Sequence, residues 1–115
     1  MIARLMGLAV ITPEALLREV EARRVTVLDV NAPERFTLAH VPGARHLDPA
    51  GFGAAELPPD LDAGLVFYCS NLLCRKAPDA ARRARQMGFG DVKVMSAGIS
   101  GWTGAGLPTE ALARG

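Results

Sequence analysis

One short stretch of the chain holds the residues best suited to covalent chemistry. Residues 65–68 are apolar and favour a β-strand, Cys69 follows them, and an alanine-spaced helical pattern begins a few residues after Arg75. This pattern predicts a buried strand that ends in a cysteine, then a loop, then a helix. Loop amides and the first N–H groups of a helix stabilise negative charge at such a junction. The charged form of cysteine is the thiolate, so Cys69 is a candidate nucleophile.

Two more reactive side chains lie in the same loop, Cys74 and Arg75. The guanidinium of Arg75 offers a planar fork of donors to an oxyanion held beside Cys69. Two interpretations of Cys74 stay open. It is either a thiol that resolves an oxidised or persulfidated Cys69 as a disulfide, or a small buried apolar residue at the end of the loop, and we prefer the packing role.

Composition limits the class of protein. The chain has 115 residues, of which 50% are hydrophobic and 22% are charged, and this predicts a single globular domain over residues 1–115. The net charge of +1 gives no general reason to expect binding to nucleic acid or to an anionic membrane. Cations cluster after Cys69, and those further along are assigned to a solvated helix face: Arg82, Arg83 and Arg85.

The N-terminal stretch gives no sign of export or membrane insertion. Residues 1–11 are apolar but contain Arg4, and they are far fewer than the ~20 residues that a membrane span needs. We therefore expect a cytoplasmic protein. The two cysteines do not form the disulfide framework of a small secreted fold, and the sequence has no pattern typical of a metal site.

Strands and helices alternate along the chain. Strands are predicted over residues 8–11, 25–30, 45–47, 65–68 and 91–95. Helical segments are predicted after the N-cap Thr12 and within residues 31–38, 49–62, 78–87 and 96–102. We expect residues 106–108 to end the ordered part and the last residues to fray. The alternation indicates βα units on a parallel sheet, whose ligand site lies at the carboxyl ends of the strands.

Three polar residues outside the loop are candidates for structural or catalytic roles. Asp29 stands near the end of a buried strand and needs partners, which we assign to loop amides, with a direct role at the site as the alternative. His40 precedes a turn in which Gly43 can take a positive φ, and we expect it to hold that turn rather than to act as a general base. His46 is expected at the surface.

Several short motifs, in this order and spacing, resemble the rhodanese-like family over nearly the whole chain. They are VLDV at 27–30, AHVPGA at 39–44, YC at 68–69, GF at 88–89 with Val92, AGISGW at 97–102 and GLP at 106–108. The resemblance implies an α/β fold in which a small parallel sheet is flanked by helices on both faces. It also implies a sulfurtransferase, whose cysteine takes a sulfane sulfur from a donor such as thiosulfate. The resulting persulfide passes that sulfur to cyanide, a thiol or a protein acceptor.

Carried over to this chain, the resemblance makes Cys69 the persulfide carrier. The loop amides form the cradle, Arg75 is the anion-binding residue, and Lys76 is its alternative. The candidate substrate-binding residues are Ser70, Asn71, Leu72, Leu73, Cys74, Arg75 and Lys76. The expected partners are a small sulfur-containing anion and a thiol or protein sulfur acceptor. We expect no metal or organic cofactor, no nucleic acid or membrane partner, and a monomer or weak dimer.

The loop departs from the family pattern and leaves two alternatives open. Five residues separate Cys69 from Arg75, where many family members have four. The longer spacing is that of the rhodanese-fold phosphatases of the cell-division-cycle type and of related arsenate reductases, which hold a tetrahedral oxyanion. Those enzymes have His before the cysteine, where this chain has Tyr68, and the usual loop glycine is replaced by Leu72 or Leu73. The alternatives are therefore a phosphatase or arsenate reductase, or a non-catalytic rhodanese-like binding module.

Overall fold

The computed structural model describes residues 7–112. Within them, five parallel strands form one sheet in the order β1-β5-β4-β2-β3. The strands are β1 (Ala9–Val10), β2 (Val25–Asp29), β3 (Arg45–His46), β4 (Gly64–Tyr68) and β5 (Val92–Val94). The central strand, β4, pairs with β2 on one side and with β5 on the other. The residue that follows β4 therefore lies at the carboxyl end of the sheet, near its middle.

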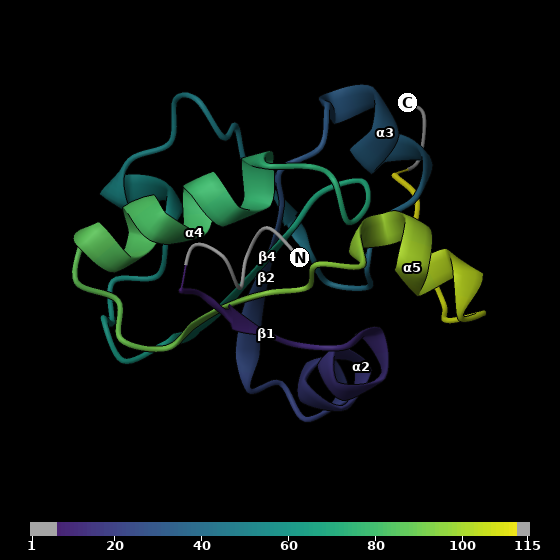
Figure 1. Ribbon diagram of the computed structural model, residues 1–115, viewed down its shortest axis with the longest axis horizontal. Coiled ribbons are helices and arrows are strands. Elements are labelled where there is room, and N and C mark those ends of the chain that lie inside the picture. Colours follow the sequence, from purple (N-terminus) through teal and green to yellow (C-terminus); the bar gives the residue numbers. More distant parts are fainter. Residues whose placement is uncertain (1–6, 113–115) are drawn as a thin grey trace.

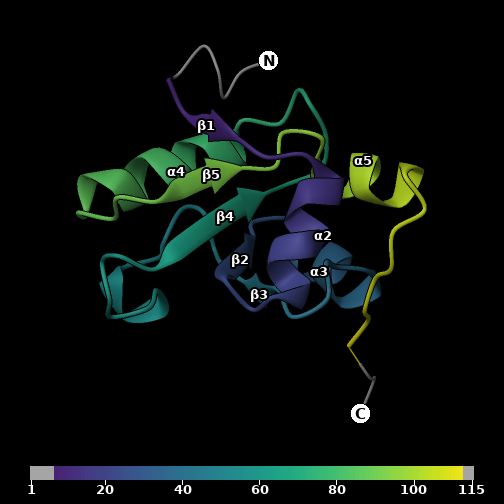
Figure 2. The same cartoon turned by 90° about the horizontal axis from the view of Figure 1, so that it is seen from below.

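Helices cover both faces of this sheet (Figures 1 and 2). They are α2 (Pro13–Glu21), α3 (Pro33–Leu38), the short 3-10 helix η1 (Ala54–Glu56), α4 (Lys76–Gln86) and α5 (Gly98–Gly104). The core beneath α4 lies on one face, and the core beneath α2, α3 and α5 lies on the other. The predicted α/β architecture, a parallel sheet flanked on both faces, is confirmed.

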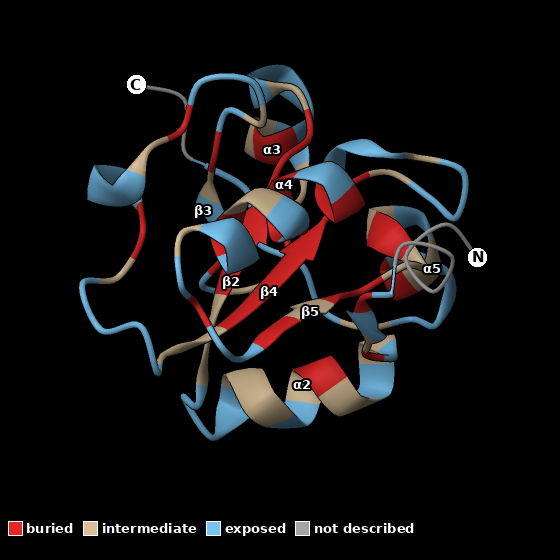
Figure 3. Cartoon of the chain, turned by 60° about the vertical axis from the view of Figure 1, so that its left-hand side comes forward, coloured by how far each residue is buried: buried red, intermediate tan, exposed pale blue. Residues whose placement is uncertain are grey.

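Strand β4 is buried along its whole apolar stretch and appears red in Figure 3. Leu65 and Phe67 belong to the core on the α4 side, and Val66 and Tyr68 belong to the core on the opposite side. This division follows from the two-residue repeat of a strand, and burial on both faces explains why the stretch is almost wholly apolar. Cys69 continues the alternation and enters the core on the α4 side.

Helix α4 carries small side chains on its inner face, as the sequence predicts. Those buried against the sheet are Ala77, Ala80, Ala81 and Ala84. The helix starts at Lys76, two residues before the predicted start, because Pro78 is tolerated in a first turn, where its missing N–H is not needed. The first turn of α4 therefore packs directly beside Cys69.

The predicted N-terminus of the first helix is also confirmed. The Thr12 hydroxyl accepts a hydrogen bond from the Ala15 N–H at 3.1 Å, and a proline occupies the first turn. The predicted strands at 8–11 and 91–95 are each shortened, to β1 and β5. Among residues 7–112, no helix has the length and apolar composition that crossing a membrane requires.

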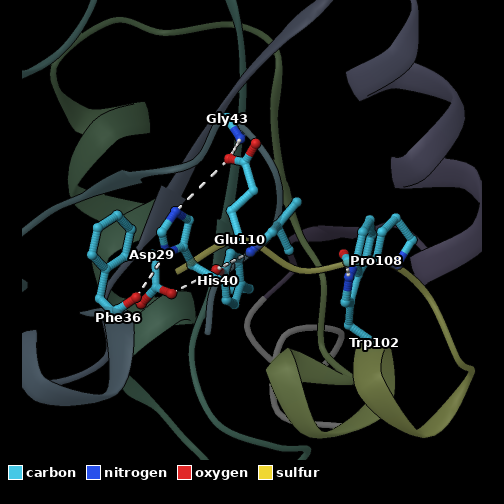
Figure 4. Close-up of polar contacts among 9 residues, drawn as sticks. Asp29, Phe36, His40, Gly43, Trp102, Pro108 and Glu110 are labelled. Carbon is cyan, nitrogen blue, oxygen red and sulfur yellow. Dashed lines mark hydrogen bonds and ion pairs between the residues drawn. The ribbon is translucent and has the colours of Figure 1, made fainter. Parts of the chain in front are cut away.

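The prediction that the chain frays after residue 108 is wrong as far as Leu112. His40 and Glu110 form an antiparallel bridge, with N···O distances of 2.9 Å in both directions. The Glu110 carboxylate also accepts a hydrogen bond from the Gly43 N–H at 2.8 Å (Figure 4). The Leu112 N–H donates to the Thr37 carbonyl at 3.0 Å. Main-chain bonds to the 37–43 segment therefore hold this part of the chain in place.

Candidate functional site

Cys69 lies at the carboxyl end of β4 with its backbone tied to α5. Its carbonyl accepts a hydrogen bond from the Ile99 N–H at 2.9 Å, and the Ser70 carbonyl accepts one from the Ser100 N–H at 3.0 Å. The Cys69 residue is only 3% exposed. The start of the loop therefore has one fixed position, set by the strand and by the first turn of α5.

Gly98 allows this close approach between α5 and the loop. Its φ is +66°, and a Cβ atom there would lie 2.5 Å from the Ser70 carbonyl carbon and 2.7 Å from the Asn71 nitrogen. No side chain fits at these distances, and a positive φ also favours glycine. This contact explains the first glycine in the AGISGW motif.

The loop closes on itself through a disulfide bond between Cys69 and Cys74, whose Cα atoms are 6.4 Å apart. Asn71 shapes the turn between them. Its side-chain oxygen accepts a hydrogen bond from the Leu73 N–H at 2.9 Å, and its carbonyl accepts one from the Cys74 N–H at 3.2 Å. Cys74 does pack, half-buried, against the core on the α4 side. The packing role preferred from the sequence is therefore only part of what Cys74 does, because this residue also forms the disulfide bond.

The cavity beneath the closed loop is small. Its volume is about 10 Å³, which is room for one water molecule and not for a sulfur oxyanion. Two of the predicted cradle amides, those of Leu73 and Cys74, donate to Asn71. The loop must therefore open before a ligand of this class can bind beside Cys69.

A hydroxyl without a partner borders the same cavity. The Ser96 side chain lines it, and within the described part of the chain its buried Oγ has no hydrogen-bond partner. Buried polar atoms normally have one, so this hydroxyl is available to a ligand. The sequence analysis missed Ser96, although it follows strand β5 at the same edge of the sheet as Cys69.

The two candidate anion-binding side chains are exposed at the start of α4. Arg75 is the N-cap residue and Lys76 is the first helical residue. The small cavity beside Cys69 is lined by neither of these two. Lys76 instead borders a neighbouring hollow of about 350 Å³, together with Asn31 and His46. The closed loop thus brings Cys69 and Cys74 together, whereas Arg75 and Lys76 lie outside the cavity beside Cys69.

Comparison with known proteins decides the family. The family profile described as "Rhodanese-like domain" matches residues 12–105. The chain belongs to the rhodanese-like domain family. The fold and the family expected from the motifs are therefore confirmed.

Two relatives and one solved structure illustrate the likeness. The chain is 41% identical over 87% of its length to the HTH-type transcriptional regulator Rv0324 of Mycobacterium tuberculosis, but it spans only 44% of that protein. It is 32% identical to the thiosulfate sulfurtransferase GlpE of Pseudomonas aeruginosa, over 80% of this chain and 81% of the relative. A crystal structure of a thiosulfate sulfurtransferase from Pseudomonas aeruginosa superposes with a TM-score of 0.80 at 28% identity, covering 92% of this chain and 20% of that one.

A buried polar network supports the loop of this rhodanese-like domain from the opposite face of the sheet. The Tyr68 hydroxyl donates to Asp29 at 2.5 Å and accepts from the Val41 N–H at 3.0 Å. The other Asp29 oxygen accepts from the Asn31 N–H at 2.8 Å. The Asn31 side-chain oxygen in turn accepts from the Ser70 hydroxyl at 2.8 Å. The structural role predicted for Asp29 is confirmed, and the network links it to the residue after Cys69.

Tyr68 stays protonated in this network. Burial raises the pKa of Tyr68 far above its usual value of 10.0, and the neighbouring Asp29 carboxylate raises it further. The neutral phenol can therefore donate a hydrogen bond to the Asp29 carboxylate. One feature of the sequence does indicate such a network, namely a tyrosine inside an apolar strand, because a buried phenol needs a polar partner.

The rings of both histidines approach main-chain carbonyl oxygens. The His40 ring stacks on Phe36 with centroids 3.9 Å apart, and its Nδ1 lies 2.7 Å from the Phe36 carbonyl oxygen, with Glu110 on the other side (Figure 4). The predicted role of His40 at the turn is indirect, because its ring lies 4.0 Å from the Glu110 carboxylate, and it is this carboxylate that accepts the hydrogen bond from the Gly43 N–H of the turn. The expectation of a surface position for His46 is wrong, because this half-buried ring approaches the Asn31 carbonyl at 2.8 Å. Across residues 7–112, no cluster of three His, Cys, Asp or Glu residues could hold a metal ion.

Proposed function

We propose that this rhodanese-like domain is a sulfurtransferase in which Cys69 carries a sulfane sulfur as a persulfide. The position of Cys69 carries the proposal, because this thiol-bearing residue lies at the end of the central strand, between a loop start bonded to α5 and the first turn of α4, and such a position suits a nucleophile. The 32% identity to a protein named thiosulfate sulfurtransferase supports thiosulfate as the donor.

The reaction starts from reduced Cys69. The thiolate attacks the outer sulfur of thiosulfate, the sulfur–sulfur bond of thiosulfate breaks, and sulfite leaves with the bonding electrons. Cyanide, a thiol or a protein acceptor then attacks the outer sulfur of the persulfide and returns the Cys69 thiolate. The N–H groups at the start of α4 favour the thiolate and the anions that approach it. Ser96 contributes a free hydroxyl at the same cavity.

The reaction needs a reduced loop, which agrees with the proposed cytoplasmic location, where cysteines are kept as thiols. A disulfide in such a compartment is normally transient and part of a redox cycle. A monomer or weak dimer stays a prediction. In the closed loop Arg75 lies outside the cavity, and a phosphatase or arsenate reductase stays the alternative.

Mass spectrometry of the anaerobically reduced protein after thiosulfate treatment tests the proposal. The Cys74→Ser variant is the best background, because it cannot close the disulfide. We expect it to gain one sulfur on the peptide with Cys69, to lose that sulfur to cyanide as thiocyanate, and to gain none once Cys69→Ser is added. If Cys69 alkylates readily but gains no sulfur, the proposal is wrong, and arsenate and phosphate esters are the next substrates to test.

A further inference from the structure

We propose that Cys74 is a resolving thiol that discharges the Cys69 persulfide inside the loop, so that the protein releases sulfide and is left with a disulfide bond. The inference rests on the proposed function, since it begins from the persulfide. It assigns a second catalytic residue and a second activity, the reduction of sulfane sulfur to sulfide at the expense of a dithiol.

The geometry that supports this role is the closed loop itself. The chain has two cysteines in total, and they are bonded to each other across the loop that follows β4. Their Cα separation of 6.4 Å lies within the range of ordinary disulfides. The Asn71 hydrogen bonds that hold this closed form are all local to the loop.

The closed loop is reached without an unfavourable backbone. Among the described residues, the non-glycine residue with a positive φ is Arg23, which lies far from the loop. All residues from 70 to 75 therefore take ordinary conformations. The loop needs no hinge glycine to bring Cys74 to Cys69. Leu73 is 83% exposed and Leu72 is 53% exposed, and although Leu72 also borders the small cavity beside Cys69, neither side chain keeps the two sulfurs apart.

The proposed step balances without an outside oxidant. The Cys74 thiolate attacks the inner sulfur, Cys69 Sγ, so that the Cys74–Cys69 bond forms and the bond to the outer sulfur breaks. The outer sulfur, which takes up a proton from water after loading, leaves with the bonding pair as hydrosulfide. In this step the outer sulfur gains one electron and the Cys74 sulfur supplies it. Over loading and discharge together, the sulfane sulfur gains two electrons, one from each cysteine. A dithiol reductant then restores both thiols.

The exposures of the two sulfur-bearing residues set the direction of that second reduction. Cys69 is 3% exposed, whereas Cys74 is half-buried at the loop's outer end. A dithiol therefore attacks Cys74, and Cys69 leaves as the thiolate, because exchange occurs at the accessible sulfur. The nucleophile that accepts the next sulfur is thus regenerated directly.

A single-turnover measurement tests the resolving role. Anaerobically reduced wild type and Cys74→Ser are loaded with thiosulfate, freed of excess donor, and followed by sulfide detection and peptide mass spectrometry without added thiol. Wild type should release one sulfide for each disulfide formed. Cys74→Ser should keep its persulfide and release sulfide at least about 100-fold more slowly, because the internal thiol acts at high effective concentration. Leu38→Ala, which shortens an exposed side chain at the end of α3 and keeps both thiols, should discharge like wild type.

Three results would overturn the inference. They are a wild-type persulfide as long-lived as that of Cys74→Ser, a disulfide that forms only in air and without sulfide, and a sulfur atom that moves to Cys74. Cys74→Ala repeats the test if Cys74→Ser does not fold. Loading with inorganic polysulfide separates the two proposals. If polysulfide alone loads Cys69 and Cys74 discharges it, the thiosulfate reaction fails and the resolving role stands.

Discussion

Replacing Tyr68 with Phe removes one hydroxyl from the buried network beneath the loop. That hydroxyl donates to Asp29 and accepts from the Val41 N–H. Its loss leaves the Val41 N–H without a partner, which costs about 1–3 kcal/mol of stability. It also removes a hydrogen bond to a carboxylate, which contributes about 1.5–3 kcal/mol. Asp29 keeps its bond from the Asn31 N–H. We therefore expect Tyr68→Phe to lower the free energy of unfolding by about 3–5 kcal/mol at neutral pH.

This difference should narrow at alkaline pH. Burial, followed by the charge of Asp29, raises the pKa of folded Tyr68 far above 10.0. Unfolded Tyr68 loses its proton at pH 10 and above, while the folded protein keeps it, so stability falls as pH rises. The Tyr68 contribution is complete below about pH 10 and declines by about 1.4 kcal/mol per pH unit above it. Phenylalanine has no proton to lose and removes this dependence.

Urea unfolding of both proteins at neutral pH and near pH 11 measures the two effects. Tyr68 is the sole tyrosine of the chain, so tyrosinate absorbance reports this residue alone. The native protein should show no tyrosinate until it unfolds. Thr37→Val, which removes a hydroxyl whose hydrogen bond goes to the Pro33 carbonyl of its own helix, is the control and should change stability by less than about 0.5 kcal/mol. Two results would refute the energies assigned to this network. One is ionisation of Tyr68 in the folded protein near pH 10, and the other is a fall in the free energy of unfolding of less than about 1 kcal/mol in Tyr68→Phe.

Three further substitutions test the site and its frame. Gly98→Ala should displace the loop peptide and slow sulfur loading of the reduced protein, whereas Gly104→Ala, which meets open space, should leave loading unchanged. Ser96→Ala removes an unsatisfied buried hydroxyl, so it should leave the melting temperature unchanged or higher while slowing sulfur loading. The assignment of Arg83 to a solvated helix face is wrong, because its guanidinium bonds two carbonyls of the 49–52 segment. Lysine cannot span both, so Arg83→Lys should cost about 1–2 kcal/mol in urea unfolding. The same change at exposed Arg82 should have no effect.

Local chemistry was enough to predict the elements that frame the site. The Thr12 cap, the alanine face of α4 and the apolar stretch of β4 each depend on residues close together in sequence, and each is confirmed. The Asp29–Tyr68 bond could not be predicted in the same way. These residues are 39 positions apart and meet because β2 and β4 pair in a register that makes them direct neighbours. No local pattern fixes that register.

The conformation of the loop also depends on distant residues. Its start is held by amides of α5 and by the absence of a side chain at Gly98, and its hydroxyl at Ser70 is held by Asn31. The sequence therefore left both packing and disulfide formation open for Cys74, and the packing role that it favoured is not the full one. The spacing of two cysteines gives their separation along the chain, but the turn made by Asn71 determines their separation in space.

Different interactions hold the two halves of the loop, and this difference matters for the proposed reaction at Cys69. The first half, at Cys69 and Ser70, is fixed by hydrogen bonds to α5 and to the network on the far side of the sheet. The second half is exposed, and the disulfide with Asn71 holds it closed. Reduction removes the disulfide from the second half and no hydrogen bond from the first. Under the proposed function, Cys69 thus stays in place while the covering half of the loop loses its covalent tie and keeps only the local hydrogen bonds to Asn71, so a loop without the usual glycine can open to an anion.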